Sequence, residues 1–165
     1  MFDGLTSESP ETRLAASAEI LDHRALTLQA IASNVEKYLP DDERPATAGD
    51  NIALLGKLRA SDYVPLLVQN LTFEVFYKAT KRPQTTEDLY PAVQALIDIG
   101  SPAVGPVLER LKQESEEVVQ KTALAVLRGV LGPDWAGAIL DREIRVATSS
   151  GAKERLRQAM TLMQA

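Results

Sequence analysis

The chain contains no cysteine and only one histidine among its 165 residues. Without cysteine it has no disulfide bond, no thiolate nucleophile and no thiolate metal site, and nothing points to an oxidising compartment. The single histidine, His23, excludes a motif that needs two histidines to bind a metal. A position in a turn or between helices is a simpler interpretation of His23 than a role as catalytic base.

Long apolar runs are also missing. No stretch approaches the roughly 20 apolar residues that cross a bilayer as a helix. Residues 1–10 have neither the basic start nor the apolar core of a secretory signal. We therefore expect a soluble, cytoplasmic protein without a membrane span.

Aromatic residues are scarce at 5% of the chain, whereas hydrophobic residues reach 45% and charged residues 25%. Alanine and leucine supply much of the apolar content, which suits close-packed helices better than a β-sandwich rich in β-branched and aromatic residues. A chain of this length fits one domain with a substantial core.

Capping and spacing signals predict a series of helices. Ser9 and Pro10 are typical of a helix start, and Leu14, Ala18 and Leu21 follow with the spacing of one helical face. Similar patterns predict helices over about 24–39, 50–60, 63–78, 86–99, 103–112, 115–130, 134–146 and 152–163. Loops containing proline are expected at 40–49 and 78–86. No alternating strand pattern is bounded by turns, so the predicted class is all-α.

One pattern recurs along the chain. Residues 96–111 combine an apolar helix end, a Gly100-Ser101-Pro102 break and a second apolar helix. Further on, Leu131-Gly132-Pro133 breaks the chain again and residues 135–140 restart it. A two-helix unit cannot bury its apolar face alone, so such units occur in stacked arrays.

The chain resembles the bacterial HEAT-repeat family over three segments. Residues 92–108, Ala-Val-Gln-Ala-Leu-Ile-Asp-Ile-Gly-Ser-Pro-Ala-Val-Gly-Pro-Val-Leu, carry the resemblance best. Residues 116–124 and 10–16 look like the opening of the family's first helix. The loops at 40–49 and 79–85 are longer than the family's usual turns.

The resemblance implies a short, irregular α-solenoid of stacked helical hairpins, a HEAT-like superhelix. Residues 1–165 would form one such domain, with repeats at about 7–39, 50–80, 86–114 and 115–148 and a C-terminal capping helix at 152–163. Second helices around 63–77, 103–112 and 134–146 would line a concave surface. Protein binding is the commonest use of this architecture, although fold alone does not decide function.

No constellation in the sequence indicates catalysis, a cofactor or a metal. The glycines are scattered, without a phosphate loop or a dinucleotide fingerprint. Carboxylate pairs at 41–42, 87–88 and 116–117 stand in a loop or at predicted helix starts, where the helix dipole explains them. We therefore expect a protein that is not an enzyme.

Aromatic and basic residues gather in the middle of the chain. The candidate partner-binding residues are Tyr63, Phe73, Phe76, Tyr77, Lys78, Lys81 and Arg82. Aromatic side chains with arginine are typical of binding hot spots, but the spacing at 73, 76 and 77 also suits a core stripe, so both interpretations stay open. For Trp135, core packing is the favoured interpretation and an exposed anchor is the alternative.

Charge is distributed unevenly. Residues 1–50 carry ten acidic and four basic residues, whereas residues 116–165 carry six acidic and seven basic residues. The acidic start disfavours a nucleic-acid surface. Because the two ends differ in charge, head-to-tail association of copies into a homo-oligomer is a further hypothesis.

Together these patterns predict a non-enzymatic protein–protein interaction scaffold or adaptor, acting alone or as a subunit of a larger assembly. Two alternatives stay open. One is a HEAT-like enzyme that acts on nucleic-acid bases or attaches a chromophore. The other is an immunity- or inhibitor-type binding protein.

Overall fold

The computed structural model describes residues 9–39, 45–75 and 85–164, and all regular structure within them is helical. The longer helices are α1 (Pro10–Asp22), α2 (Arg24–Tyr38), α3 (Pro45–Lys57), α6 (Pro91–Ile99), α7 (Val104–Gln113), α8 (Glu117–Leu131), α9 (Pro133–Val146) and α10 (Ser150–Gln164). Two short helices, α4 (Val64–Gln69) and α5 (Thr86–Leu89), lie between α3 and α6 in sequence. The all-α prediction is confirmed for these residues.

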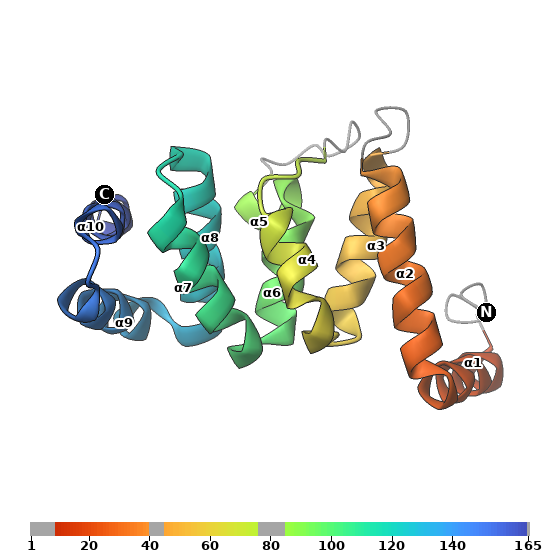
Figure 1. Ribbon diagram of the computed structural model, residues 1–165. Helices are drawn as coiled ribbons and strands as arrows, with labels where there is room; N and C mark the ends of the chain where they lie inside the picture. Colours follow the sequence, from red (N-terminus) through yellow and green to blue (C-terminus); the bar gives the residue numbers. More distant parts are fainter. Residues whose placement is uncertain (1–8, 40–44, 76–84, 165) are drawn as a thin grey trace.

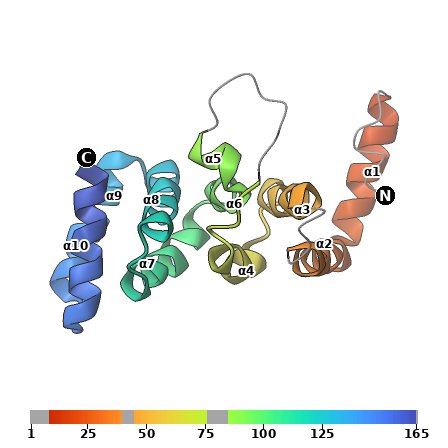
Figure 2. The same ribbon diagram turned by 90° about the horizontal axis from the view of Figure 1, so that it is seen from above.

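The middle of the molecule is a double layer of helices. Seen from above, α2, α4 and α7 lie in one row and α3, α6 and α8 in the other (Figure 2). Helix α3 packs against α2 and α6, and α8 packs against α6 and α7. At the two ends of the molecule, α1 on one side and the pair α9 and α10 on the other run crosswise to these rows (Figure 1).

A continuous apolar core runs between the two rows. Its fully buried side chains include Ile31 of α2, Ile52 of α3, Leu96 of α6 and Leu127 of α8. Small residues bring the helices of one row close together. A Cβ atom built on Gly56 of α3 would lie 2.4 Å from a backbone atom of α6, so this contact tolerates only glycine.

Polar side chains cap α1 and α5; the predicted cap of α1, Ser9, is confirmed, whereas the cap of α5 is Thr85. The Ser9 hydroxyl accepts a hydrogen bond from the Thr12 N–H at 3.3 Å. The Thr85 hydroxyl accepts from the Asp88 N–H at 3.3 Å while the Asp88 carboxylate accepts from the Thr85 N–H at 3.0 Å. These side chains satisfy N–H groups that have no partner within the helix.

The predicted breaks at the two glycine–proline motifs are also confirmed. Gly100 has φ +85° and Gly132 has φ +81°, a left-handed region that favours glycine. Each glycine directly follows a helix, α6 or α8, at the position where such a residue ends helices.

Three predicted boundaries differ from the structure. Residues 45–49 were predicted as part of the loop at 40–49, yet α3 begins at Pro45 and already buries Ala48 and Gly49. Proline is well suited to a first helical position, because it has no N–H to satisfy and its φ is preset. The buried residues of this turn, Ala48 and Gly49, are small, so the composition of the segment does not indicate that it packs against the core.

The predicted helix from residue 63 to about residue 78 is interrupted as well. Helix α4 ends at Gln69, and the Asn70 side chain donates a hydrogen bond to the Leu66 carbonyl at 2.8 Å. The chain then runs without helix to Val75, whose N–H donates to the Leu89 carbonyl at 2.9 Å. Leu71 and Val75 are buried, so core packing holds this irregular segment.

The third boundary difference lies before α6. The helix predicted over 86–99 is two helices, because Tyr90 between them has φ −117° and ψ 87°. The residue before a proline is disfavoured in the helical region, and Pro91 follows Tyr90 directly.

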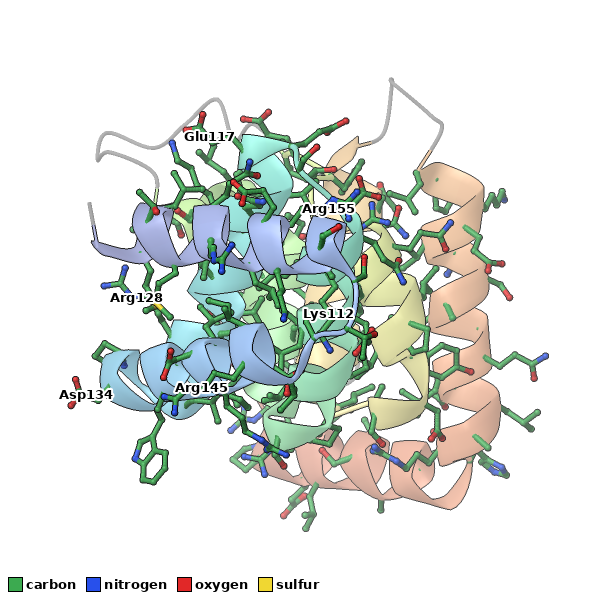
Figure 3. All side chains as sticks on the ribbon, turned by 60° about the vertical axis from the view of Figure 1, so that its left-hand side comes forward. Lys112, Glu117, Arg128, Asp134, Arg145 and Arg155 are labelled. Atoms are coloured by element: carbon green, nitrogen blue, oxygen red, sulfur yellow. The ribbon has the colours of Figure 1, made fainter. Side chains whose placement is uncertain are left out.

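The C-terminal helix α10 packs against α7, α8 and α9. Its Arg155 guanidinium donates a hydrogen bond to the Lys112 carbonyl of α7 at 3.0 Å. The Lys112 ammonium in turn forms an ion pair with Glu143 of α9 at 2.8 Å. Figure 3 shows Lys112 and Arg155 at this junction of the three helices.

Candidate protein-binding surface

The most exposed apolar surface of α9 surrounds Trp135, whose exposed fraction is 73%. The prediction that Trp135 packs in the core is therefore wrong; its side chain is exposed, and its role as an anchor stays a prediction. Together with four neighbours it lines a shallow hollow of about 360 Å³. These five residues, Leu131, Trp135, Ala138, Ile139 and Arg142, are called the α9 surface below.

The α9 surface arises because α9 carries apolar residues on two sides. Ala136 and Leu140 are fully buried and face the core. Trp135, Ala138 and Ile139 have the spacing of a second stripe, on another side of the same helix. Helix α9 packs against α8 and α10, and on its second stripe Trp135 and Ala138 are exposed, whereas Ile139 is half-buried against the core.

The turn before α9 sets this orientation. Gly132 takes a left-handed φ, Pro133 begins the new helix, and the axes of α8 and α9 are bent by 119° relative to each other. In a compact helical hairpin the second helix would fold back along the first. Here the bend of 119° directs α9 away from α8 instead of back along it. The side of α9 that carries Trp135 therefore has no neighbouring helix in the described chain.

Charge in the hollow comes from one residue. Arg142 is exposed, and no described residue forms an ion pair with it. The other charged groups of α9 beyond its first turn are paired, since Arg145 binds Asp141 and Glu143 binds Lys112. The α9 surface therefore offers an apolar hollow with one available cation at its edge.

Lys112 anchors α9 from the inner side. Its ammonium lies 2.7 Å from a Glu109 oxygen and 2.8 Å from a Glu143 oxygen. The hydrogen bond to Glu109 and then that to Glu143 raise the pKa of Lys112 above its ordinary range. The charged form is thus favoured, and it holds Glu143 on the side of α9 that faces α7.

A second set of hollows lies over α8. One of about 400 Å³ is lined by Thr86, Tyr90, Glu117, Val118, Lys121 and Thr122. Its two charged residues neutralise each other, because Lys121 and Glu117 form an ion pair at 2.5 Å. This pairing lowers the pKa of Glu117. The hollow has less exposed apolar character than the α9 surface, with Val118 at 37% exposure.

The predicted partner-binding residues are only partly within the described chain. Tyr63 and Phe73 are half-buried and pack against the core. Phe76, Tyr77, Lys78, Lys81 and Arg82 lie outside the described residues. For Tyr63 and Phe73 the core interpretation accounts for much of the side chain, and neither lies on the α9 surface.

The residues considered above as candidates for catalysis have structural roles, wherever they lie in the described part of the chain. His23 occupies the turn between α1 and α2, as expected. Asp88 belongs to the cap of α5, and Glu117 pairs with Lys121. Among residues 9–39, 45–75 and 85–164, no three His, Asp or Glu side chains gather as a metal site would require.

No single helix in the described segments is long and apolar enough to span a membrane. Helices α8 and α9 reach the required length and composition only when taken together, across their bend of 119°.

No protein-family model, curated protein or solved structure matches this chain. The described residues define the class of the protein as an all-helical array that exposes an apolar surface, with a tryptophan in it, at one end.

Proposed function

We propose that this chain is a non-enzymatic binding protein, a short HEAT-like α-solenoid that recognises a protein partner through the α9 surface. The observation that carries the proposal is the 73% exposure of Trp135 beside an apolar hollow. Tryptophan and arginine dominate the binding energy of protein interfaces, and Arg142 stands in the same hollow.

The shape and charge of the α9 surface specify the kind of ligand. A hollow that follows one helix over two turns suits an amphipathic helix laid along it. Arg142 would pair with an acidic side chain of that helix. The partner segment is therefore a helix with small and large apolar residues on one face and a carboxylate at one end of that face.

The two-row arrangement of helices supports the solenoid part of the proposal. Each row grows by adding one helix beside the previous one, as stacked hairpins do. A rigid array of this kind fixes α9 through Lys112 and α10, so the α9 surface is formed before a partner arrives. A preformed surface loses less entropy on binding than a flexible one.

The test is an affinity capture with the tagged chain and matched variants. Trp135→Ala and Arg142→Glu should each lose a partner that the unaltered chain captures. Leu26→Ala should retain it, because Leu26 is an equally exposed apolar residue of α2, at 67% exposure, away from α9. Each variant changes an exposed side chain, so its stability should stay within about 0.5 kcal/mol of the unaltered chain.

A further arm separates the α9 surface from the basic segment predicted to bind partners. Lys81→Glu with Arg82→Glu should leave capture intact if the α9 surface is the binding site. Loss of the partner in that variant, with full retention by Trp135→Ala, would contradict the proposal and favour the segment at 63–82.

A further inference from the structure

Helix α1 leaves an apolar stripe in solvent at the opposite end of the molecule from α9 (Figure 1). Leu14 has an exposed fraction of 73%, and Ala16 is the only buried residue of the stretch 10–19. A helix of 13 residues is marginal in water without packing. The stripe therefore has the character of a docking surface rather than a core surface.

One face of α1 matches the α9 surface residue by residue. Glu11, Leu14 and Ala18 share that face with the i, i+3, i+7 spacing. On α9 the corresponding order is Trp135, then Ala138 with Ile139, then Arg142. Both series span seven residues, or roughly 10.5 Å along a helix axis.

An antiparallel alignment of the two helices makes each contact complementary. Ala18, the smallest side chain of the α1 face, meets Trp135, the largest of the α9 surface. Leu14 meets Ala138 and Ile139. The Glu11 carboxylate meets the Arg142 guanidinium, and neither group has an ion-pair partner among the described residues. The same antiparallel alignment therefore matches the two helices both in side-chain size and in charge.

A contact between the two surfaces requires two copies of the chain. Within one molecule, both rows of helices separate α1 from α9 (Figure 1). Helix α1 lies at one end of the molecule and α9 shares the other end with α10, so in copies placed end to end α1 of one copy can reach α9 of the next (Figure 1). Such a head-to-tail contact repeats, and it builds a ring or an open fibre according to the rotation between copies.

From this match we infer that α1 of one copy docks into the α9 surface of a second copy, so that the chain assembles head to tail. The inference rests on the proposed function, since it names the partner of the α9 surface. One helix on one hollow buries less area than a standard stable interface, so the contact is weak and assembly depends on concentration. Salt weakens the Glu11–Arg142 pair, because exposed charges are screened.

Trp135 is the only tryptophan of the chain, so its fluorescence reports on the contact directly. The full-length protein is followed by sedimentation velocity and by Trp emission over a wide range of concentration. We expect the mass to rise with concentration, with emission moving to shorter wavelength and iodide quenching decreasing together with it.

Four variants identify the contact. Leu14→Ala keeps or raises helix propensity and should raise the concentration of half-assembly by about tenfold or more. Arg142→Glu should weaken assembly similarly, and adding Glu11→Arg to it should restore assembly. Glu36→Arg, a charge reversal at an exposed site on α2, should change nothing and serves as the control.

Circular dichroism of each variant checks that α1 remains folded, since an arginine at residue 11 faces the positive end of the helix dipole. A mass that stays monomeric at all concentrations, with Trp135 exposed throughout, would overturn the inference. Assembly unaffected by both Leu14→Ala and Arg142→Glu would overturn it too. If a different protein is captured in a Trp135-dependent way by a monomeric chain, the proposed function stands while this inference fails.

Discussion

Glycine residues at helix contacts set how closely α3, α6 and α8 pack within their row. At Gly56 the hypothetical Cβ would approach the Cα of Ala95 to 2.4 Å and its Cβ to 2.8 Å. At Gly129 the nearest atom is the side-chain Cδ1 of Ile97 at 2.5 Å, which can rotate away. The contact at Gly56 is therefore the stricter one, because a backbone cannot move aside as a side chain can.

Gly56→Ala should lower the free energy of unfolding by about 1–3 kcal/mol, the usual cost of overpacking a core. Urea denaturation of the two proteins measures the difference. Gly105→Ala is the matched control, since nothing lies within 4 Å of the Cβ it would add to α7. It should change the free energy of unfolding little, because the gain from replacing a glycine in a helix is offset by the strain of a Cβ before Pro106 in helical backbone. Equal effects of the two variants would contradict the packing of α3 on α6.

Single residues also show what the sequence can and cannot predict. Ser9 as a helix cap follows from local chemistry, and a hydrogen bond to the Thr12 N–H confirms it. The exposure of Trp135 depends instead on the direction that α9 takes after Gly132, which no local pattern fixes. The available signal was the second apolar stripe of α9, since a helix with apolar residues on two sides must either be enclosed or present one of them.

At the scale of elements, the predicted helix starts were accurate where a polar cap stands, as before α1 and α5. Two of the boundaries that were missed depend on tertiary packing, whereas the break before α6 is local, at Tyr90 before Pro91. Pro45 begins α3 because small residues at 48 and 49 find a place against the core. Helix α4 ends early, and the irregular chain that follows it buries Leu71 and Val75 in the core. Burial decides such boundaries, and sequence periodicity does not report it.

Lys112 connects three elements, and its titration offers a test of that connection. Because its pKa is raised in the folded protein by Glu109 and Glu143, charged Lys112 adds stability that is present below the lysine pKa of the unfolded chain. That stability is lost as the pH rises through the higher pKa of the folded state. The free energy of unfolding should therefore decline in the alkaline range.

Lys112→Met removes the charge and keeps the length of the side chain. At neutral pH it should cost about 1–2 kcal/mol, since Glu143 loses a hydrogen-bonded partner. In alkaline solution the difference between the two proteins should shrink, because the unaltered lysine then also becomes neutral. Urea denaturation at a series of pH values measures both effects. Lys121→Met is the comparison, as its ion pair with Glu117 is exposed and contributes little. A difference that stays constant with pH would contradict the role given to Lys112.

At the scale of the whole molecule, the two ends differ from the middle. The breaks at Gly100 and Gly132 were predictable from sequence, because glycine followed closely by proline is a local signal for the end of a helix. The crosswise placement of α1 and α9 was not, since it follows from the turns at His23 and Gly132. Tyr63 and Phe73 gave a plausible site from composition, but their partial burial follows from the irregular path after α3. The α9 surface could not be predicted from sequence, because it depends on the crosswise placement of α9 at one end of the molecule.

The weak packing of α1 makes a last prediction about the whole chain. Helices opening independently of the core exchange their amide hydrogens at low free energy. In dilute, monomeric solution the amides of residues 12–19 should be protected by no more than about tenfold, the level of a marginal isolated helix. Those of α6 and α8 should exchange only on global unfolding, because their buried residues hold both rows together.

Hydrogen exchange read by mass spectrometry at two concentrations extends this prediction to assembly. At a concentration where copies associate, protection should rise in residues 12–19 and on α9, and stay constant in α2. Arg142→Glu should abolish the rise on both helices while leaving α6 and α8 unchanged, because Arg142 is an exposed residue of α9 outside the core. High protection of α1 in a strictly monomeric sample would show that the helix is stabilised within its own chain. The exposed residues of α1 would then need no partner for the helix to be stable, and the main physical argument for the head-to-tail contact would fail.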